Sequence, residues 1–365
     1  MSLLLFEFKK LFRSKLFLYF LVFSIIAVTL LFVRNFWQQE SVRAEKITYF
    51  SKFARDVSME LEGNRKVLED NPSPELEEQV RIGSMVYSQI NEVVNAIQSQ
   101  HSMDELTTEN TLYQTAKQYK ALDGTFYLSE SEMDRVTRLN DQLIREGLPK
   151  EDLKLTIQPL LFTQLVLSYA LTGFGFLALL LILLSSVTGE YEEKNIRLVY
   201  TLPFSRARYM LIKLGSFLVA GVVWLTIVTV SAYTLASQFT DALENQSAYP
   251  FAEVEGNWIQ IADVIQNGLV LGGMALILVL TFGWFIGYTF RSTLLSYLIA
   301  ILVVAGGALL VINGGPFQWN PLSALQVQQT LIDQYSTQWR IYLLLLFSIA
   351  LLVMGTLSIN RKRGV

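Results

Sequence analysis

The sequence has few of the residue types on which soluble enzymes depend. It contains no cysteine and one histidine, His101, among 365 residues. It can therefore form no disulfide, no thiolate nucleophile and no metal site built from cysteines or a histidine cluster. Charged residues make up 17% of the chain and hydrophobic residues 52%, whereas an average soluble domain is about 25% charged. These proportions exclude an ordinary soluble enzyme and indicate a membrane protein.

A nucleotide-binding loop is also missing. The phosphate-cradling pattern Gly-x-x-x-x-Gly-Lys-Ser/Thr does not occur, and no glycine is followed by lysine anywhere in the chain. The chain therefore cannot bind ATP through such a loop. We predict that it is not an enzyme, that it has no catalytic or metal-binding residues, and that it binds no cofactor itself.

Six long stretches without Asp, Glu, Lys or Arg predict six membrane-spanning helices. A spanning helix needs about 20 apolar residues, because each residue rises about 1.5 Å through a hydrocarbon core of about 30 Å. The expected spans, TM1 to TM6, are 16–33, 160–187, 214–237, 264–290, 294–312 and 341–359. TM1 has the basic start of a signal peptide, but Arg34 follows it in place of a small-residue cleavage site, so we predict a retained anchor. The expected fold class is an all-α integral membrane protein.

Lysine and arginine near the span ends predict the orientation of the chain. The N-terminal stretch, the TM2–TM3 segment, Arg291 and the C-terminal end together carry 13 basic and 4 acidic residues. The short loops on the opposite side carry one basic residue, Arg340, and six acidic ones. We therefore expect both termini in the cytoplasm. Residues 34–158 are then outside because one span separates them from the N-terminus, not because of their own charge. The expected location is the plasma membrane of a bacterial cell.

Residues 34–158 form a polar insert with 22 acidic and 15 basic residues. Apolar residues recur in it at three-to-four spacing, which predicts a helical extracellular domain. Ser102 with Glu105 and Ser129 with Glu132 each match a capping box. Because no Gly/Ser-rich linker joins the insert to TM1 or TM2, we expect a stiff connection. Packing between helices explains the apolar stripes; the alternative is that one of them binds a partner or the substrate.

Residues 1–15 are predicted to form an amphipathic helix, an elbow before TM1. Such a helix lies at the membrane surface, with its apolar side in lipid and its basic side towards anionic headgroups. Glu7 and Lys10 lie away from the apolar face. One interpretation is that the basic residues only orient TM1. The other is an elbow that receives force from a partner, through Phe8, Lys9, Lys10, Phe12 and Arg13.

The segment 188–212 begins with three acidic residues at the cytoplasmic end of TM2. Acidic side chains there oppose the helix dipole, so their presence needs another reason, such as pairing with basic residues of a partner or of the elbow helix. A short apolar stretch follows and stops at proline. These features predict a docking segment that couples the chain to a partner, through Glu190, Glu192, Glu193, Arg197, Leu202, Pro203 and Arg206.

These motifs resemble one known family. The arrangement Glu-x-Glu … Leu-x-x-Thr-Leu-Pro-x-Ser-Arg … Lys after the second of six spans resembles the type-2 family of ABC transporter permeases, the exporter group. That family's elbow helix is similar to the stretch near the start, Phe-Lys-Lys-Leu-Phe-Arg-Ser-Lys. Its outer re-entrant segment is similar to the stretch before TM6, Asn-Pro-Leu-Ser-Ala-Leu. One departure is Asn195-Ile196, where the family often has Gly-Thr.

The resemblance implies a specific assembly. Such a permease forms half of a twelve-helix pore with a copy of itself or a sister permease. Two cytoplasmic ATPase subunits, which bind ATP and Mg, dock on the segment after the second span, and their closure drives the substrate outward. No nucleic acid is involved. We expect residues 313–339 to dip back into the outer leaflet as a lid, with Trp319 and Pro321 as an outer gate.

The span cores contain no Asp, Glu, Lys, Arg or His. Ion-coupled carriers usually need such groups, so the uncharged cores favour an amphipathic or hydrophobic cargo, such as a peptide, a lipid or an antibiotic. Polar residues such as Tyr169 in TM2 either line a path or bond neighbouring helices. The glycine pairs Gly268/Gly272 and Gly283/Gly287 indicate close packing within the chain or at a dimer face.

Two other functions are considered. The first is a mechanotransmitter, an ATPase-linked protein whose outside helices regulate an extracellular enzyme without moving cargo; proteins of that type have four spans. The second is a receptor, but no cytoplasmic signalling domain is present. The sequence leaves open the identity of the cargo and whether the permease pair is homomeric or heteromeric.

Overall fold

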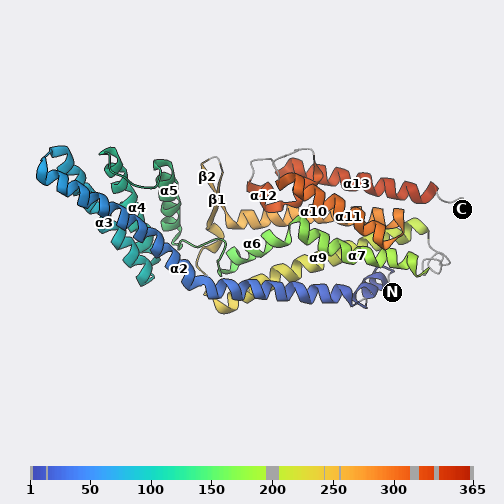
Figure 1. The fold of residues 1–365 in the computed structure, drawn as a ribbon. Helices are drawn as coiled ribbons and strands as arrows, with labels where there is room; N and C mark the ends of the chain where they lie inside the picture. The colour runs from blue at the N-terminus through green and yellow to red at the C-terminus, as the bar shows by residue number, and fades with distance from the viewer. Residues whose placement is uncertain are drawn as a thin grey trace.

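The computed structural model describes residues 3–13, 15–194, 205–241, 243–254, 256–312, 320–332 and 337–361. The described chain is an elongated helical molecule, with a bundle of apolar helices at one end and a polar helical domain at the other (Figure 1). The start of α1 (Leu3–Arg13) and the end of α13 (Thr337–Arg361) lie at the same end of the bundle, far from the polar domain. This arrangement agrees with termini on one side of a membrane.

The helix α2 (Leu16–Asp70) joins the two parts of the molecule without a break. Its 55 residues extend about 82 Å at 1.5 Å per residue. The predicted boundary between TM1 and the outside domain, at residues 33 and 34, therefore lies inside one continuous helix. The prediction of a connection without a flexible linker is confirmed for this side of the domain.

The polar domain is helical, as predicted. The outer part of α2 packs against α3 (Pro74–Ser99), α3 against α4 (Ser102–Ala121), and α4 against α5 (Glu130–Glu146). The apolar stripes read from the sequence form its core, which includes Phe53, Val57, Val86, Ile90 and Val93.

The two predicted capping boxes have different outcomes. The box at α5 is present, since the Glu132 N–H donates to Ser129 Oγ at 3.2 Å and the Ser129 N–H donates to the Glu132 carboxylate at 3.3 Å. The box at Ser102 is wrong. Helix α4 already begins at Ser102, so His101 occupies the capping position and no side-chain cap forms.

The second connection of the polar domain to the bundle is also held by hydrogen bonds. Asn35 Nδ2 on α2 donates to the backbone carbonyl of Thr156 at 3.0 Å, and Gln39 Nε2 donates to that of Leu155 at 2.6 Å. Thr240 Oγ1 donates to the carbonyl of Ile157 at 3.3 Å. The chain that leaves the domain is thus held against two bundle helices before the next span begins.

The predicted single helix of TM2, 160–187, is wrong in one respect. The structure has two helices there, α6 (Pro159–Ala170) and α7 (Gly173–Glu192). Thr172 Oγ1 accepts a hydrogen bond from the Gly175 N–H at 3.3 Å and caps α7. A Cβ atom on Gly175 would lie 2.1 Å from the carbonyl oxygen of Ala170, so the close approach at the break requires glycine.

The remaining bundle helices are α9 (Arg206–Phe239), α10 (Ile261–Phe290), α11 (Thr293–Ile312), the short α12 (Val327–Ile332) and α13. Five of the described helices are long and apolar enough to cross a membrane, namely α2, α7, α9, α10 and the Gln338–Leu357 part of α13. Helix α6 and the Thr293–Leu309 part of α11 are apolar but shorter. The described chain is therefore an all-α membrane protein in its main architecture.

One feature departs from the all-α prediction. Between α9 and α10, the strands β1 (Pro250–Val254) and β2 (Asn257–Gln260) form an antiparallel hairpin. Its turn includes Gly256 at φ 81°, a left-handed conformation that favours glycine. Arg138 on α5 forms an ion pair of 2.9 Å with Glu253 on β1, so the hairpin contacts the polar domain.

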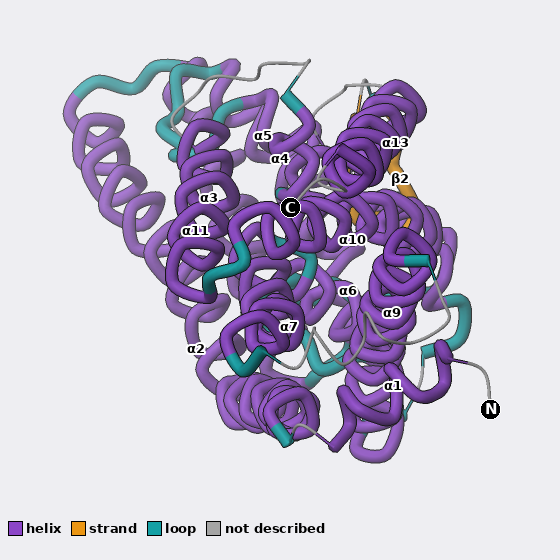
Figure 2. The backbone as a smooth tube through the Cα atoms, turned by 90° about the vertical axis from the view of Figure 1, so that its right-hand side faces the viewer, coloured by secondary structure: helices purple, strands orange, loops and turns teal. Residues whose placement is uncertain are grey.

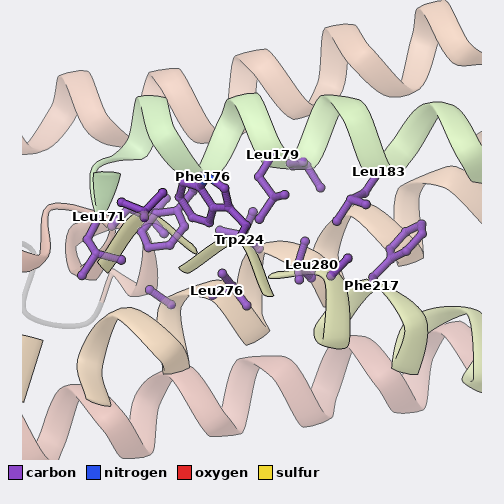
Figure 3. Close-up of a cluster of buried hydrophobic side chains, with 14 of the residues drawn as sticks. Leu171, Phe176, Leu179, Leu183, Phe217, Trp224, Leu276 and Leu280 are labelled. Carbon is purple, nitrogen blue, oxygen red and sulfur yellow. The ribbon is translucent and has the colours of Figure 1, made fainter. Parts of the chain in front are cut away.

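The core of the bundle lies between α7, α9 and α10. Figure 3 shows side chains from these helices, among them Phe176, Phe217, Trp224 and Leu280, pointing toward one another. A Cβ on Gly283 would lie 2.0 Å from Leu180 Cδ1, which shows how closely α10 approaches α7. The glycine spacing at this position is therefore explained by packing within the chain.

Candidate functional site

A buried ionic cluster lies at the end of the bundle that contains α1. Lys213 Nζ is 2.6 Å from Glu190 Oε1 and 2.9 Å from Glu7 Oε2. Lys10 Nζ is 2.6 Å from the same Glu190 oxygen. The Tyr209 hydroxyl lies 3.0 Å from Glu190 Oε2 and 3.3 Å from Glu7 Oε1. We call these five residues the ionic cluster.

Three helices supply the cluster, and one of them, α1, is far from the other two in the sequence. Glu7 and Lys10 come from successive turns of α1, Glu190 from the last turn of α7, and Tyr209 and Lys213 from the first two turns of α9. Spacings of three and four residues place each helical pair on one face. Figure 2, which looks at this end of the bundle, shows α1 beside α9, and these two helices are in contact.

The charges of the cluster balance. Two carboxylates face two ammonium groups, and the side chain of Lys213 is only 1% exposed. A buried charge is tolerated when it is paired and its remaining hydrogen-bonding capacity is satisfied. The Tyr209 hydroxyl supplies a further donor within reach of either carboxylate. The four charged members therefore depend on one another, and removal of any of them leaves the charges of the cluster unbalanced.

The structure divides the three acidic residues at the end of α7. Glu190 is buried and pairs with Lys10, so the alternative of pairing with the N-terminal helix is confirmed for this residue. Glu192 is exposed, and its carboxylate accepts a hydrogen bond of 2.7 Å from the Thr293 N–H at the start of α11. Glu193 is exposed and lies just beyond α7.

The expected orientation of the N-terminal helix needs a correction. Glu7, predicted on the side that faces lipid headgroups, is buried and points to α9, because Lys213 provides its partner there. Phe8 and Phe12 are half-buried and stack edge to face at 4.9 Å, and Phe12 does the same with Phe17 at 5.4 Å. Lys9 and Arg13 are exposed, and so are Leu5 and Phe6.

Other contacts extend the connection at this end of the bundle to α10. The Trp284 indole N–H, fully buried, donates to the carbonyl of Met210 at 2.8 Å. Tyr288 packs edge to face on Tyr191 at 5.9 Å, and the Arg291 guanidinium lies 5.4 Å from the Tyr191 ring. The ends of α7, α9 and α10 therefore form one packed unit with α1.

The other predicted site residues are divided by position. Arg206 is exposed at the first position of α9, which follows residues 195–204 in the sequence. Arg197, Leu202, Pro203 and Trp319 lie outside the described residues. Pro321 begins the short 3-10 helix η2 (Pro321–Leu325) and lines an apolar cavity of about 190 Å³ between α10, α11 and α13.

Sequence reasoning missed three members of the cluster as site residues: Glu7, Tyr209 and Lys213. Tyr209 and Lys213 are polar residues four positions apart at the start of a predicted span, and Glu7 is an acidic residue in a basic segment. A lysine beside a span and an acidic residue in a basic segment both indicate charges that need a partner. Their pairing could not be read from the sequence, because about 200 residues separate α1 from α9. Among the described residues, no group of three or more His, Asp and Glu residues could hold a metal ion.

The fold and the cluster define a multi-pass membrane protein in which α1, α7 and α9 are joined by ion pairs at one end of the bundle. Residues 1–358 match the family model described as ABC-2 family transporter protein, and the chain belongs to this family. The resemblance drawn from the motifs is thus confirmed. The chain is the membrane component of an ABC transporter, a type of subunit that associates with ATPase subunits. Searches of curated proteins and of solved structures found no match.

Proposed function

We propose that this chain is the permease subunit of an ATP-driven exporter that moves an amphipathic or hydrophobic cargo outward across a bacterial cell membrane. The chain spans the membrane six times, with α6 and α7 together as TM2 and α11 as TM5, and both termini are cytoplasmic. Helix α1 is the elbow. Two partner ATPase subunits bind ATP and Mg, a second permease completes the pore, and this chain itself catalyses no reaction.

The ionic cluster is the observation that supports this function. Glu190 lies five residues before the segment 195–204, and Tyr209 and Lys213 lie five and nine residues after it. Both ends of this segment are thereby tied to each other and to α1. A force applied to the segment by an ATPase would move α1, α7 and α9 together, which is what a permease needs to change the shape of its transmembrane path.

The exposed residues around the segment supply a surface for an ATPase. Glu192 and Glu193 lie before it, and Arg206 begins the helix after it. In this proposal they dock the partner together with Arg197 and Pro203, while the buried cluster transmits the movement. For Glu192, Glu193 and Arg206 this role follows from their exposure, because a partner reaches only exposed side chains.

Charge reversal of Glu192 and Glu193 combined with deletion of Pro203 tests the docking role. The permease and ATPase are purified together, reconstituted in liposomes, and assayed for assembly, ATP hydrolysis and cargo movement. We expect loss of assembly or hydrolysis without transport. An intact complex that hydrolyses ATP and moves cargo at the normal rate would overturn the proposed function.

A mechanotransmitter remains the second candidate, because α2 passes unbroken from the bundle into the outside domain. Movement of its inner half would tilt α3, α4 and α5 as one body. The absence of cysteine makes spin labelling direct, so labels at introduced cysteines on α3 and α9 report such a tilt during ATP turnover. A tilt with no cargo movement in liposomes identifies a transmitter, whereas ATP-dependent cargo movement identifies the exporter.

A further inference from the structure

A lateral groove runs along the bundle between α2, α6, α7 and α9. Its volume is about 490 Å³, within the roughly 300–1,000 Å³ of small-molecule sites. Helix α2 lines it from Phe20 to Arg34, a length of about 21 Å at 1.5 Å per residue. The groove is thus elongated along α2, with a volume that suits an extended molecule.

The break between α6 and α7 creates the hollow. Ala170, Gly175 and Ala178 line the groove where larger side chains would fill it. Tyr169 and Phe174, on the two sides of the break, also line it and are 57% and 81% exposed. Non-helical backbone at membrane depth is tolerated only where protein buries it or it lines a cavity. Interrupted spanning helices are also typical of binding sites in transporters.

The wall of the groove offers hydrocarbon and few free polar atoms. The Trp224 indole N–H donates to Ser24 Oγ at 3.2 Å, and that hydroxyl donates to the carbonyl of Phe20 at 2.9 Å. The remaining contacts come from residues such as Val28 and Leu31. Such a wall binds an apolar chain while the polar groups of Trp224 and Ser24 keep their hydrogen bonds.

One charged side chain lines the groove, and it lies at one end. Arg34 is the residue of α2 nearest to the outside domain among those that line the groove, and it is exposed. In the proposed orientation it lies at the outer surface of the membrane. The guanidinium group of arginine pairs with phosphate oxygens through charge-assisted hydrogen bonds, so it can bind the phosphate of a lipid headgroup. Charge and shape together therefore fit a molecule with a long apolar tail and one anionic head.

We propose that this groove binds an anionic phospholipid-like amphiphile, with its acyl chain along α2 and its headgroup at Arg34. The inference rests on the proposed function for its orientation and deepens it, because it names the chemical class of the cargo. The tail runs from the outer surface towards the cytoplasmic side, as the tail of a lipid in the outer leaflet does. The amphiphile thus enters or leaves that leaflet through the groove.

Photolabelling of the full chain in lipid nanodiscs tests this site. The nanodiscs consist of phosphatidylcholine with a small fraction of phosphatidylglycerol that carries a diazirine on its acyl chain; the matched probe is phosphatidylcholine with the same diazirine. Mass spectrometry locates the labelled peptides. We expect label from phosphatidylglycerol on the groove-lining parts of α2 and α7. The Arg34→Gln variant should lower this label about fivefold and leave the phosphatidylcholine label unchanged.

Two filling variants test the place of the acyl chain. Ala178→Trp and, from the opposite wall, Ala27→Phe should each remove the groove label from both probes. Val222→Trp is the matched control, because Val222 is 60% exposed on α9 but does not line the groove. It should leave the label unchanged. Circular dichroism and size-exclusion profiles show which variants are folded. If one of the two filling variants does not fold, the other alone provides the test.

Three results would overturn the proposal. The first is label spread evenly over the lipid-facing helices, and the second is equal label from the two probes in the unmodified chain. The third is a disulfide that forms between two copies of the chain carrying Phe23→Cys and Phe174→Cys while the groove stays unlabelled. This result would show that a second copy of the chain covers this face. The assay contains no ATPase, so its failure beside intact ATP-coupled transport removes only the groove proposal. Loss of docking beside intact labelling removes only the exporter function.

Discussion

Lys213 and Glu190 form an ion pair of 2.6 Å, and residues 195–204 lie between them in the sequence. The pair therefore closes the segment that we propose as the ATPase docking site. Glu7 joins the pair from α1, where it lies 2.9 Å from the same ammonium group. The residues that flank the segment are consequently joined to each other and to the N-terminal helix.

The substitution Lys213→Met should destabilise the bundle. It leaves Glu7 and Glu190 as buried carboxylates with only Lys10 beside them, and removal of one partner from a buried ion pair costs about 3–5 kcal/mol. Thermal unfolding of the purified chain in detergent measures the loss. The control Lys9→Met changes an exposed lysine of α1 and should shift stability by less than about 0.5 kcal/mol.

A double substitution distinguishes the loss of the ion pair from the loss of the lysine side chain. Glu7→Gln combined with Lys213→Met restores the charge balance, so the double variant should lose less stability than the sum of the two single variants. Strict additivity would show that Glu7 and Lys213 do not interact.

Glu190→Gln and Glu193→Gln should affect different steps. Glu190 is buried and paired with two lysines, so its neutralisation should weaken the contact of α1 with α7 and uncouple ATP hydrolysis from movement. Glu193 is exposed, so its neutralisation should weaken ATPase binding and lower thermal stability less than neutralisation of the buried Glu190 does. Titration of the ATPase and thermal unfolding of the permease measure the two effects. Identical profiles for the two variants would contradict this division.

The break between α6 and α7 should not tolerate a larger residue. Gly175→Ala places a Cβ 2.1 Å from the Ala170 carbonyl oxygen, and overpacking of this kind costs about 1–3 kcal/mol. Gly189→Ala is the matched control on α7, since a Cβ there meets nothing within 4 Å. Thermal unfolding should show a loss for the first variant and no loss for the second. A larger loss of stability in Gly189→Ala than in Gly175→Ala would contradict this prediction.

The outside domain should lose stability in acid through Glu109. Burial by itself would raise the pKa of this carboxyl, but Lys150 at 2.7 Å and hydrogen bonds from Asn140 and Tyr113 lower it overall. Because the folded pKa lies below the unfolded value of about 4.3, the stabilisation is present above that value and is lost as the pH falls through the folded pKa.

Hydrogen exchange of α4 and α5 in the full chain measures this loss. Exchange should rise as the pH falls below about 4.3, after correction for the intrinsic exchange rate. Glu109→Gln should weaken the pH dependence, whereas Glu92→Gln, at an exposed position of α3, should preserve it. The same pH dependence in both variants would show that another group is responsible.

The elements that follow from local pattern were predicted well. The apolar stretches of α9 and α10, the helical outside domain and the capping box at Ser129 each depend on residues within a few positions of one another. The break at Thr172 was not predicted, although its Thr-Gly-x-Gly pattern is local. A charge-free run of 35 residues from Leu155 to Gly189 shows that the chain enters the membrane, but not where a helix stops within it.

The sequence by itself determined that this protein lies in the membrane and belongs with the ABC-2 permeases, because apolar length and local motifs are properties of short segments. Only the tertiary structure decided which charges pair. The physical reason is that burial makes Lys213 depend on Glu7 and Glu190, and burial arises only when α1, α7 and α9 are packed together. The sequence contains the charges, and the packing of the three helices selects their partners.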